Sequence, residues 1–286
     1  MHPTPMAQTD PSAYPVQQLR DAVASLEASA LLCLAKPGKV AVHRLRTSTR
    51  RVEAQLELLS MVPGLPPRQL QADKAVRLLK RLRQAAGQVR DIDVQRDLVR
   101  NEVASSKTEG EPSPDGQLRR EARRLRRVLK HNGEQAADRL LRLLHKQRAR
   151  LPIVFAELLD ALAPAGSVAL REAELIALAR DCFRKRRVPS LPDTAPQGPA
   201  ELHQIRKRAK LARYLAESAP QSFLEAHQLA ARFEALQQAG GEWHDWLILA
   251  EAATVELGNS AMLPRRFADH AERALQEFQR RLRYKI

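Results

Sequence analysis

The chain has 286 residues, enough to bury a substantial core as one large domain or two domains of ordinary size. Its 48 Lys and Arg residues against 33 Asp and Glu give a formal net charge of +15, which indicates a polyanionic partner such as nucleic acid, an anionic membrane or polymeric phosphate. The hydrophobic fraction of 44% excludes general disorder, and the two cysteines form neither a disulfide framework nor a zinc motif, which favours a cytoplasmic location.

The first half of the chain begins after a proline-rich segment, residues 1–15, that we expect to be a flexible tail without the apolar core of a signal peptide. Apolar residues at helical spacing, interrupted by Pro and Gly, predict helices over 16–34, 39–61, 68–103 and 117–162. The last of these carries a possible break at Asn132-Gly133. No apolar run is long enough to span a bilayer, so we expect no membrane partner.

The second half follows the segment Pro164-Ala165-Gly166, where we place the boundary between units 16–164 and 165–286. Helical spacing predicts four more helices over 168–188, 200–219, 221–257 and 264–283, with the proline-rich residues 188–199 as a linker. No alternating pattern typical of a strand is present. The sequence therefore predicts an all-α protein with four helices in each half.

Two basic stretches provide the strongest functional signal. VHRLRTSTRR, residues 42–51, contains one histidine and four arginines without an acidic residue, and LHQIRKRAKLARY, residues 202–214, resembles it. Both place a histidine and two cations on one helix face at i, i+3 and i+7: His43, Arg46 and Arg50 in the first stretch, and His203, Arg206 and Lys210 in the second.

The helix after each basic stretch carries another shared pattern, a glycine followed three residues later by a basic residue and Asp. Gly87 precedes Arg90-Asp91, and Gly241 precedes His244-Asp245. Two shared patterns in the same order indicate an internal duplication. We therefore predict two antiparallel four-helix bundles related by pseudo-two-fold symmetry, each offering a cationic helix face to one anionic partner.

Phosphate is the anion that these residue types suit. Arginine offers a planar fork of donors for phosphate oxygens, and successive helical turns space the cations about 5 Å apart, comparable to phosphates along an extended chain. A solvated basic surface is the simpler interpretation, but surface helices usually interleave both signs of charge. For Arg90-Asp91 and His244-Asp245, a structural ion pair and a ligand contact remain equally open.

Catalytic motifs are missing from the sequence. We find no phosphate-cradling glycine loop and no convincing Ser or Cys nucleophile. Asp91 and Asp93 lack companions at metal-ligand spacing, and His244-Asp245 lacks the further His and Asp ligands of a metal phosphohydrolase. We therefore expect no enzyme activity, no metal and no cofactor.

The stretches VHRLRTSTRR, GQVRDIDV, LHQIRKRAKLARYLAE and GGEWHDWLIL together resemble the CHAD family, the conserved histidine α-helical domain, over about residues 16–283. The resemblance implies two four-helix bundles with a basic groove or pore between them, and binding of inorganic polyphosphate, in some members on polyphosphate granules. The E-x-E-x-K motif of the triphosphate tunnel domain attached to many members is missing, so we expect a stand-alone CHAD protein.

The polyphosphate-binding residues that the resemblance implies are basic positions in four segments: His43, Arg46, Arg50 and Arg51; Arg83 and Arg90; Arg184 and Arg187; and His203, Arg206, Lys207, Lys210 and Arg213. His244 stands where the first repeat has Arg90, which departs from the pattern.

Three other functions compete with polyphosphate binding. Nucleic-acid binding fits the charge but is disfavoured by an aromatic content of 4%, which offers little base stacking. A metal-dependent phosphohydrolase built on His244-Asp245 is a second rival. A helical adaptor that recruits an acidic protein is the third.

Overall fold

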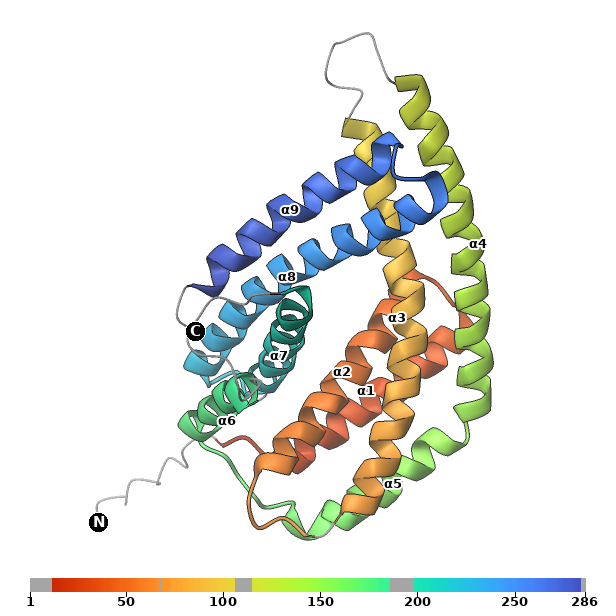
Figure 1. Cartoon of the computed structure of the whole chain (residues 1–286). Coiled ribbons are helices and arrows are strands. Elements are labelled where there is room, and N and C mark those ends of the chain that lie inside the picture. The colour runs from red at the N-terminus through yellow and green to blue at the C-terminus, as the bar shows by residue number, and fades with distance from the viewer. Residues whose placement is uncertain (1–11, 67, 106–114, 186–197, 284–286) are drawn as a thin grey trace, which may run out of the picture.

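The computed structural model describes residues 12–66, 68–105, 115–185 and 198–283, and the all-helical prediction is confirmed for them (Figure 1). These residues form α1 (Pro15–Ala35), α2 (Lys39–Met61), α3 (Gln69–Ser105), α4 (Asp115–Gln147), α5 (Arg150–Leu162), the 3-10 helix η1 (Ala163–Ala165), α6 (Glu172–Lys185), α7 (Pro199–Glu217), α8 (Leu224–Leu257) and α9 (Met262–Leu282). None of the described helices is long and apolar enough to cross a membrane.

Proline and glycine set several helix ends. Pro15 occupies the first turn of α1, where its missing N–H costs no hydrogen bond. Gly64, after α2, and Gly258, after α8, have φ angles of +76° and +87°, a backbone conformation that glycine adopts without a Cβ penalty. The structure divides the predicted helix 117–162 into α4 and α5, and the other predicted helix boundaries agree with the structure to within a few residues.

The possible break at Asn132-Gly133 is wrong, because α4 continues through it and ends at Gln147. A Cβ atom at Gly133 would lie 3.3 Å from the Ile92 side chain of α3, so this glycine permits close packing of two helices. The interruption occurs instead at residues 148–149, after which Arg150 begins α5.

The last residues of the predicted tail are part of the folded structure. Ala13 is buried, and its backbone exchanges hydrogen bonds of 2.9 and 2.8 Å with Leu170 in an isolated antiparallel bridge. Residues 1–11, and residues 188–197 of the predicted linker, lie outside the described residues.

Three hydrophobic clusters hold the helices together. The first combines α1, α2, α5, the N-terminal part of α3 and the C-terminal part of α4, through residues such as Leu45 and Phe155. The second combines α6, α7, the N-terminal part of α8 and the C-terminal part of α9, with Leu58 of α2 added. Burial of these apolar side chains is the main stabilising contribution to the fold.

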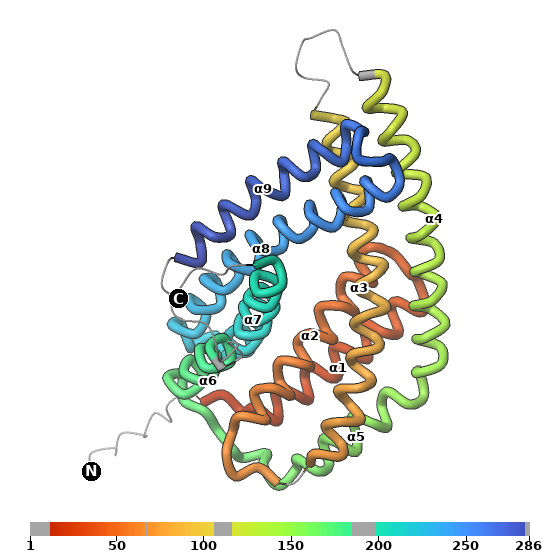
Figure 2. The backbone as a smooth tube through the Cα atoms, viewed as in Figure 1, coloured from red at the N-terminus to blue at the C-terminus, as the bar shows by residue number. Residues whose placement is uncertain are grey.

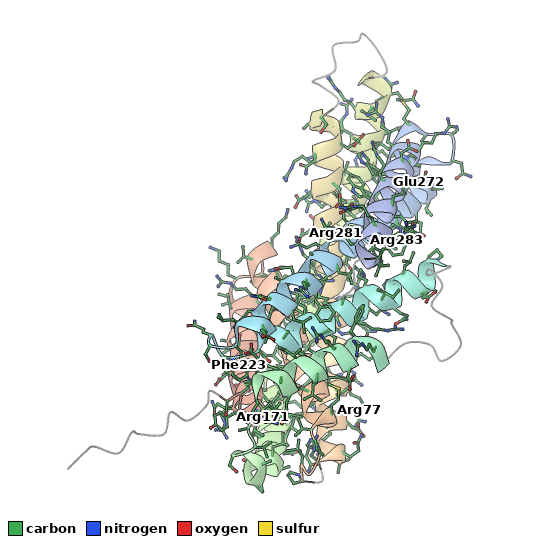
Figure 3. The ribbon with its side chains drawn as sticks, turned by 90° about the vertical axis from the view of Figure 1, so that its left-hand side faces the viewer. Arg77, Arg171, Phe223, Glu272, Arg281 and Arg283 are labelled. Carbon is green, nitrogen blue, oxygen red and sulfur yellow. The ribbon has the colours of Figure 1, made fainter. Side chains whose placement is uncertain are left out.

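The third cluster joins segments from both sides of the predicted boundary at residue 164. Val99 of α3 and Leu125 of α4 pack with Leu249 of α8 and Phe267 of α9. Figure 2 shows α3 and α4 continuing side by side to this end of the molecule, where α8 and α9 meet them. In the view of Figure 3, Glu272 on α9 lies toward this end, whereas Arg171 before α6 lies at the opposite end.

Candidate functional site

Helix α2 packs against both halves of the chain and carries the first basic stretch between them. Leu45 and Val52 are buried in the first cluster, whereas Ala54 and Leu58 are buried in the second. Because α2 also packs against α7, the polar side of α2 and the second basic stretch meet at the same place. The amphipathic pattern of α2 therefore positions Arg46 and Arg50 next to α7.

A cavity of about 810 Å³ opens at this place, with walls from α2, α3, α7 and α8. Nine of the thirteen predicted residues line it: His43, Arg46, Arg50, Arg51, Arg90, Arg206, Lys207, Lys210 and Arg213. They come from both sides of residue 164. The wall contains eight Arg and Lys residues but only three acidic residues, Asp91, Glu242 and Asp245. The cavity is therefore strongly electropositive.

Acidic residues orient part of this cationic wall. Glu53 accepts hydrogen bonds from Arg50 Nη1 at 3.2 Å and Arg83 Nε at 2.8 Å, so one carboxylate holds two arginines. Arg46 Nη2 lies 3.4 Å from Asp91 Oδ1. Asp91, which belongs to α3, thus contacts one arginine of the cavity wall. The wall as a whole keeps its excess of positive charge.

Arg213 is held more tightly than the other cations. Its Nε lies 2.6 Å from Glu217 Oε1, and its Nη2 lies 3.0 Å from Glu234 Oε1. The guanidinium also lies over the Tyr214 ring, 5.6 Å from its centroid. These contacts fix Arg213 at the edge of the cavity before any ligand arrives.

Other cations of the cavity have no protein partner among the described residues. No hydrogen bond or ion pair joins another described side chain to Arg51, Arg90, Arg206, Lys207 or Lys210. The Nε atoms of Arg50 and Arg206 are also buried without a hydrogen-bond partner in the described part of the chain. Buried donors without acceptors are costly, so the cavity has unused capacity to bind an anion.

Burial and mutual repulsion depress the basicity of the cluster. Burial, together with the neighbouring Arg46, Arg50 and Arg206, lowers the pKa of Lys210 to about 7. Burial and the nearby cations Arg90, Arg46 and Lys210 also lower the pKa of His43. An anion that enters the cavity would relieve this repulsion and favour the charged forms.

Two of the four remaining predicted residues lie beside the cavity rather than on its wall. His203 stacks on His244 with ring centroids 5.0 Å apart, and burial followed by repulsion from Arg206 lowers its pKa to about 4. It therefore stays neutral at pH 7. Arg83 pairs with Glu53, which also holds Arg50 of the wall, and does not itself line the cavity.

The other two predicted residues belong to the basic end of α6. Arg184 is exposed and does not line the cavity, because α6 packs against α7 and α8 outside it. Arg187 lies outside the described residues. None of the described side chains of α6 therefore lines the cavity.

His244-Asp245 provides no metal centre in the described part of the chain. His244 Nδ1 is buried, and it lies 3.6 Å from Asp245 Oδ1, too far for a hydrogen bond. No group of three His, Cys, Asp or Glu side chains able to hold a metal ion occurs among the described residues. Asp245 lines the cavity, whereas His244 supports the His203 ring.

Some lining residues were missed by the sequence reasoning. Gln237, Gln238 and Trp246 of α8 face the cavity, as does Tyr214 of α7. Gln238, Gly241 and Asp245 lie at i, i+3 and i+7, so they share one face of a helix. The helical spacing around Gly241 could therefore have identified Gln238 as a lining residue.

A smaller hollow of about 430 Å³ adjoins the cavity. Arg51 and Tyr214 line both, so these two side chains separate one space from the other. The far side of the smaller hollow is formed by residues of α1, including Gln18 and Ser25. The lining of the smaller hollow is not predominantly cationic, because Arg51 is accompanied there by the acidic residues Asp21 and Glu217.

The arrangement defines a class of all-helical proteins in which two basic helices face a shared central cavity. A family model described as CHAD domain matches residues 17–254, so the chain belongs to the CHAD family. This match confirms the resemblance inferred from the basic motifs. A search of curated proteins finds no match.

Two solved structures share the fold. "PptA from Streptomyces chartreusis" superposes with a TM-score of 0.64 at 18% identity, covering 95% of this chain and 99% of that chain. The crystal structure of the CHAD domain from the plant Ricinus communis superposes with a TM-score of 0.55 at 17% identity, covering 99% of this chain and 93% of that chain. At these identities the likeness concerns the fold alone.

Proposed function

We propose that the chain binds inorganic polyphosphate in the central cavity, without catalysis and without a cofactor. The observation that carries the proposal is the group of cavity cations, among them Lys210 and Arg206, that have no ion-pair partner among the described residues. Phosphoryl oxygens are the acceptors that guanidinium and ammonium groups favour. Membership of the CHAD family supports the same ligand, because polyphosphate binding is what the family resemblance implies.

We further propose that the cavity is a duplicated site. Arg46 and Arg50 of α2 would correspond to Arg206 and Lys210 of α7, as the matching spacing suggests. Each half would then contribute one cationic helix of a four-helix bundle to a basic groove or pore between them. Cytoplasmic polyphosphate granules are the location that this function would favour.

Nucleic acid fits this cavity less well than polyphosphate. Only Tyr214 and Trp246 among the lining residues are aromatic, and Trp246 already stacks on the His270 ring at 4.3 Å. Single-strand binding draws much of its energy from bases stacked on such rings. A phosphate polymer without bases needs only the spaced cations that the cavity provides.

The proposal can be tested by titrating labelled polyphosphate against the wild type and two variants of equal net charge. In the cavity variant, four lining cations become neutral: Arg46→Gln, Arg50→Gln, Arg206→Gln and Lys210→Gln. In the control variant, four exposed cations outside the cavity are replaced: Arg20→Gln, Arg77→Gln, Lys80→Gln and Arg81→Gln. Circular dichroism checks that both remain helical.

We expect the cavity variant to lose at least about a hundredfold in affinity and the control variant to lose much less, because only the first removes direct phosphate contacts. Equal affinities of the two variants would overturn the site. Phosphate release from polyphosphate that requires a divalent metal and disappears on His244→Ala would overturn the non-catalytic part of the proposal.

A further inference from the structure

The N-terminal half of α4 carries a second strongly basic surface, which we call the outer face of α4. It consists of seven exposed cations: Arg119, Arg120, Arg123, Arg124, Arg126, Arg127 and Lys130. At 1.5 Å of rise per residue they extend over roughly 16 Å of helix. None of them lines the central cavity.

The opposite side of the same segment is fully used by the core. Leu118, Ala122, Leu125 and Leu129 are buried in the third cluster, which α4 shares with α3, α8 and α9. No apolar stripe is left over that could enter a lipid bilayer, which an interfacial helix requires. The outer face of α4 therefore offers charge alone, on a convex rod.

Acidic residues neutralise this surface only in part, because Lys130 Nζ lies 3.8 Å from Glu134 Oε1. The only acid between residues 116 and 133 is Glu121, whose Oε2 accepts hydrogen bonds of 3.0 Å from the backbone N–H groups of Met262 and Leu263. Glu121 is therefore engaged at the start of α9, on the core side.

The third hydrophobic cluster lies between the cavity and the outer face of α4. Leu98 of α3 lines the cavity and also packs against this cluster, which contains Leu125 on the buried side of α4. The two basic surfaces are consequently separate. A polymer that contacts both must therefore extend beyond the cavity.

We propose that the outer face of α4 is a second contact for polyphosphate chains too long for the central cavity, a proposal that rests on the proposed function. Six of its seven cations are arginines, whose planar forks suit phosphoryl oxygens. The face carries no aromatic side chain for stacking bases. Once a chain occupies the cavity, contact with α4 is intramolecular, so the affinity gain grows with chain length until both surfaces are reached.

The experiment compares two polyphosphates of defined length on the full chain. The short chain has about eight phosphates, one for each Arg or Lys of the cavity wall. The long chain is many times that length. The α4 variant carries Arg120→Gln, Arg123→Gln, Arg124→Gln and Arg127→Gln, and the control variant carries the four exposed substitutions on α1 and α3 described above. A third variant with Lys at the same four α4 positions keeps the charge.

We expect the α4 variant to lose about tenfold or more in affinity for the long chain and to bind the short chain like the wild type. The lysine variant should retain most of the long-chain affinity. An unchanged affinity of the α4 variant for the long chain would overturn the proposal. Equal losses of affinity for both chain lengths, seen in the α4 variant and in the control variant alike, would also overturn it. So would a loss of duplex DNA binding without a loss of long-chain polyphosphate binding. A wild type that fails to bind the short chain would overturn the cavity function itself.

Discussion

Lys210 shows at the scale of one residue how the cavity is prepared for an anion. Its ammonium group shares the cavity with Arg46, Arg50 and Arg206, and burial adds to their repulsion, so that its pKa falls to about 7. Half of the molecules then carry a neutral Lys210 near neutral pH. A bound phosphate would restore the charge, so that binding and proton uptake are linked.

We predict that polyphosphate affinity falls as the pH rises from about 7 toward the ordinary lysine pKa of about 10.4. In this window the free protein loses the Lys210 proton, which the complex must take up again. Affinities measured between pH 7 and 9, or calorimetry in buffers of different ionisation enthalpy, would show it. Lys210→Arg should bind without this pH dependence, and a dependence that persists in this variant would contradict the assignment.

The same shift affects the stability of the ligand-free protein. The unfolded chain binds the Lys210 proton more tightly than the folded chain. Lys210 therefore lowers the free energy of unfolding most at and below pH 7, and this effect disappears as the pH rises toward 10. We predict that Lys210→Met raises the free energy of unfolding at pH 7 by roughly 1–3 kcal/mol while weakening polyphosphate binding. Urea denaturation checks the first effect, and a lowered stability would contradict it.

Arg206 and His203 share a helix but should contribute differently to binding. Arg206 lines the cavity as a cation, whereas His203 is neutral at pH 7 and stacks on His244. We predict that Arg206→Gln reduces the slope of log K against log salt by about one, because one phosphate contact is lost, and that His203→Gln leaves the slope unchanged. A changed slope for His203→Gln would place this residue on the ligand.

Sequence reasoning located most of the cationic wall because arginine spacing on α2 and α7 determines which side chains share a face. Spacing within α7 contains no information about α8, so it could not show that the ring of His203 stacks on His244. Nor could spacing show that Arg83 pairs with Glu53. Contacts between helices decide these positions.

At the scale of the helix, Gly240 and Gly241 of α8 are adjacent but have opposite surroundings. A Cβ atom at Gly240 would lie 2.8 Å from the buried ring of Phe278 and 3.2 Å from Arg206 Cγ, whereas one at Gly241 would meet nothing within 4 Å. Gly240 thus lets α8 approach α7 and α9. Gly241 borders the cavity, so the space beside it is open.

We predict that Gly240→Ala lowers the free energy of unfolding by about 1–2 kcal/mol, because overpacking against Phe278 outweighs the gain in helix propensity. Gly241→Ala should instead raise it by about 0.5–1 kcal/mol. Chemical denaturation of the two variants measures both effects. Effects of the same sign would contradict the packing described for α8. The sequence does not show which neighbouring helix lies against a glycine. For the same reason it could not show that Gly133 packs against α3 inside a continuous helix.

At the scale of the molecule, helices from both sides of residue 164 surround one cavity. The helices themselves follow from apolar periodicity and from proline and glycine positions, and all of this is visible in the sequence. The third hydrophobic cluster is not visible in the sequence, because it joins Val99 and Leu125 to Leu249 and Phe267 over long sequence separations. Periodicity identifies the buried face of each helix but does not say which helix covers it.

The most direct test of the account is a crystal structure of the chain with polyphosphate of defined length. We predict phosphates in the cavity between α2 and α7, with oxygens within hydrogen-bond distance of Arg46, Arg50, Arg206 and Lys210. Phosphates bound only outside the cavity, with these four side chains still free of ligand, would contradict the account.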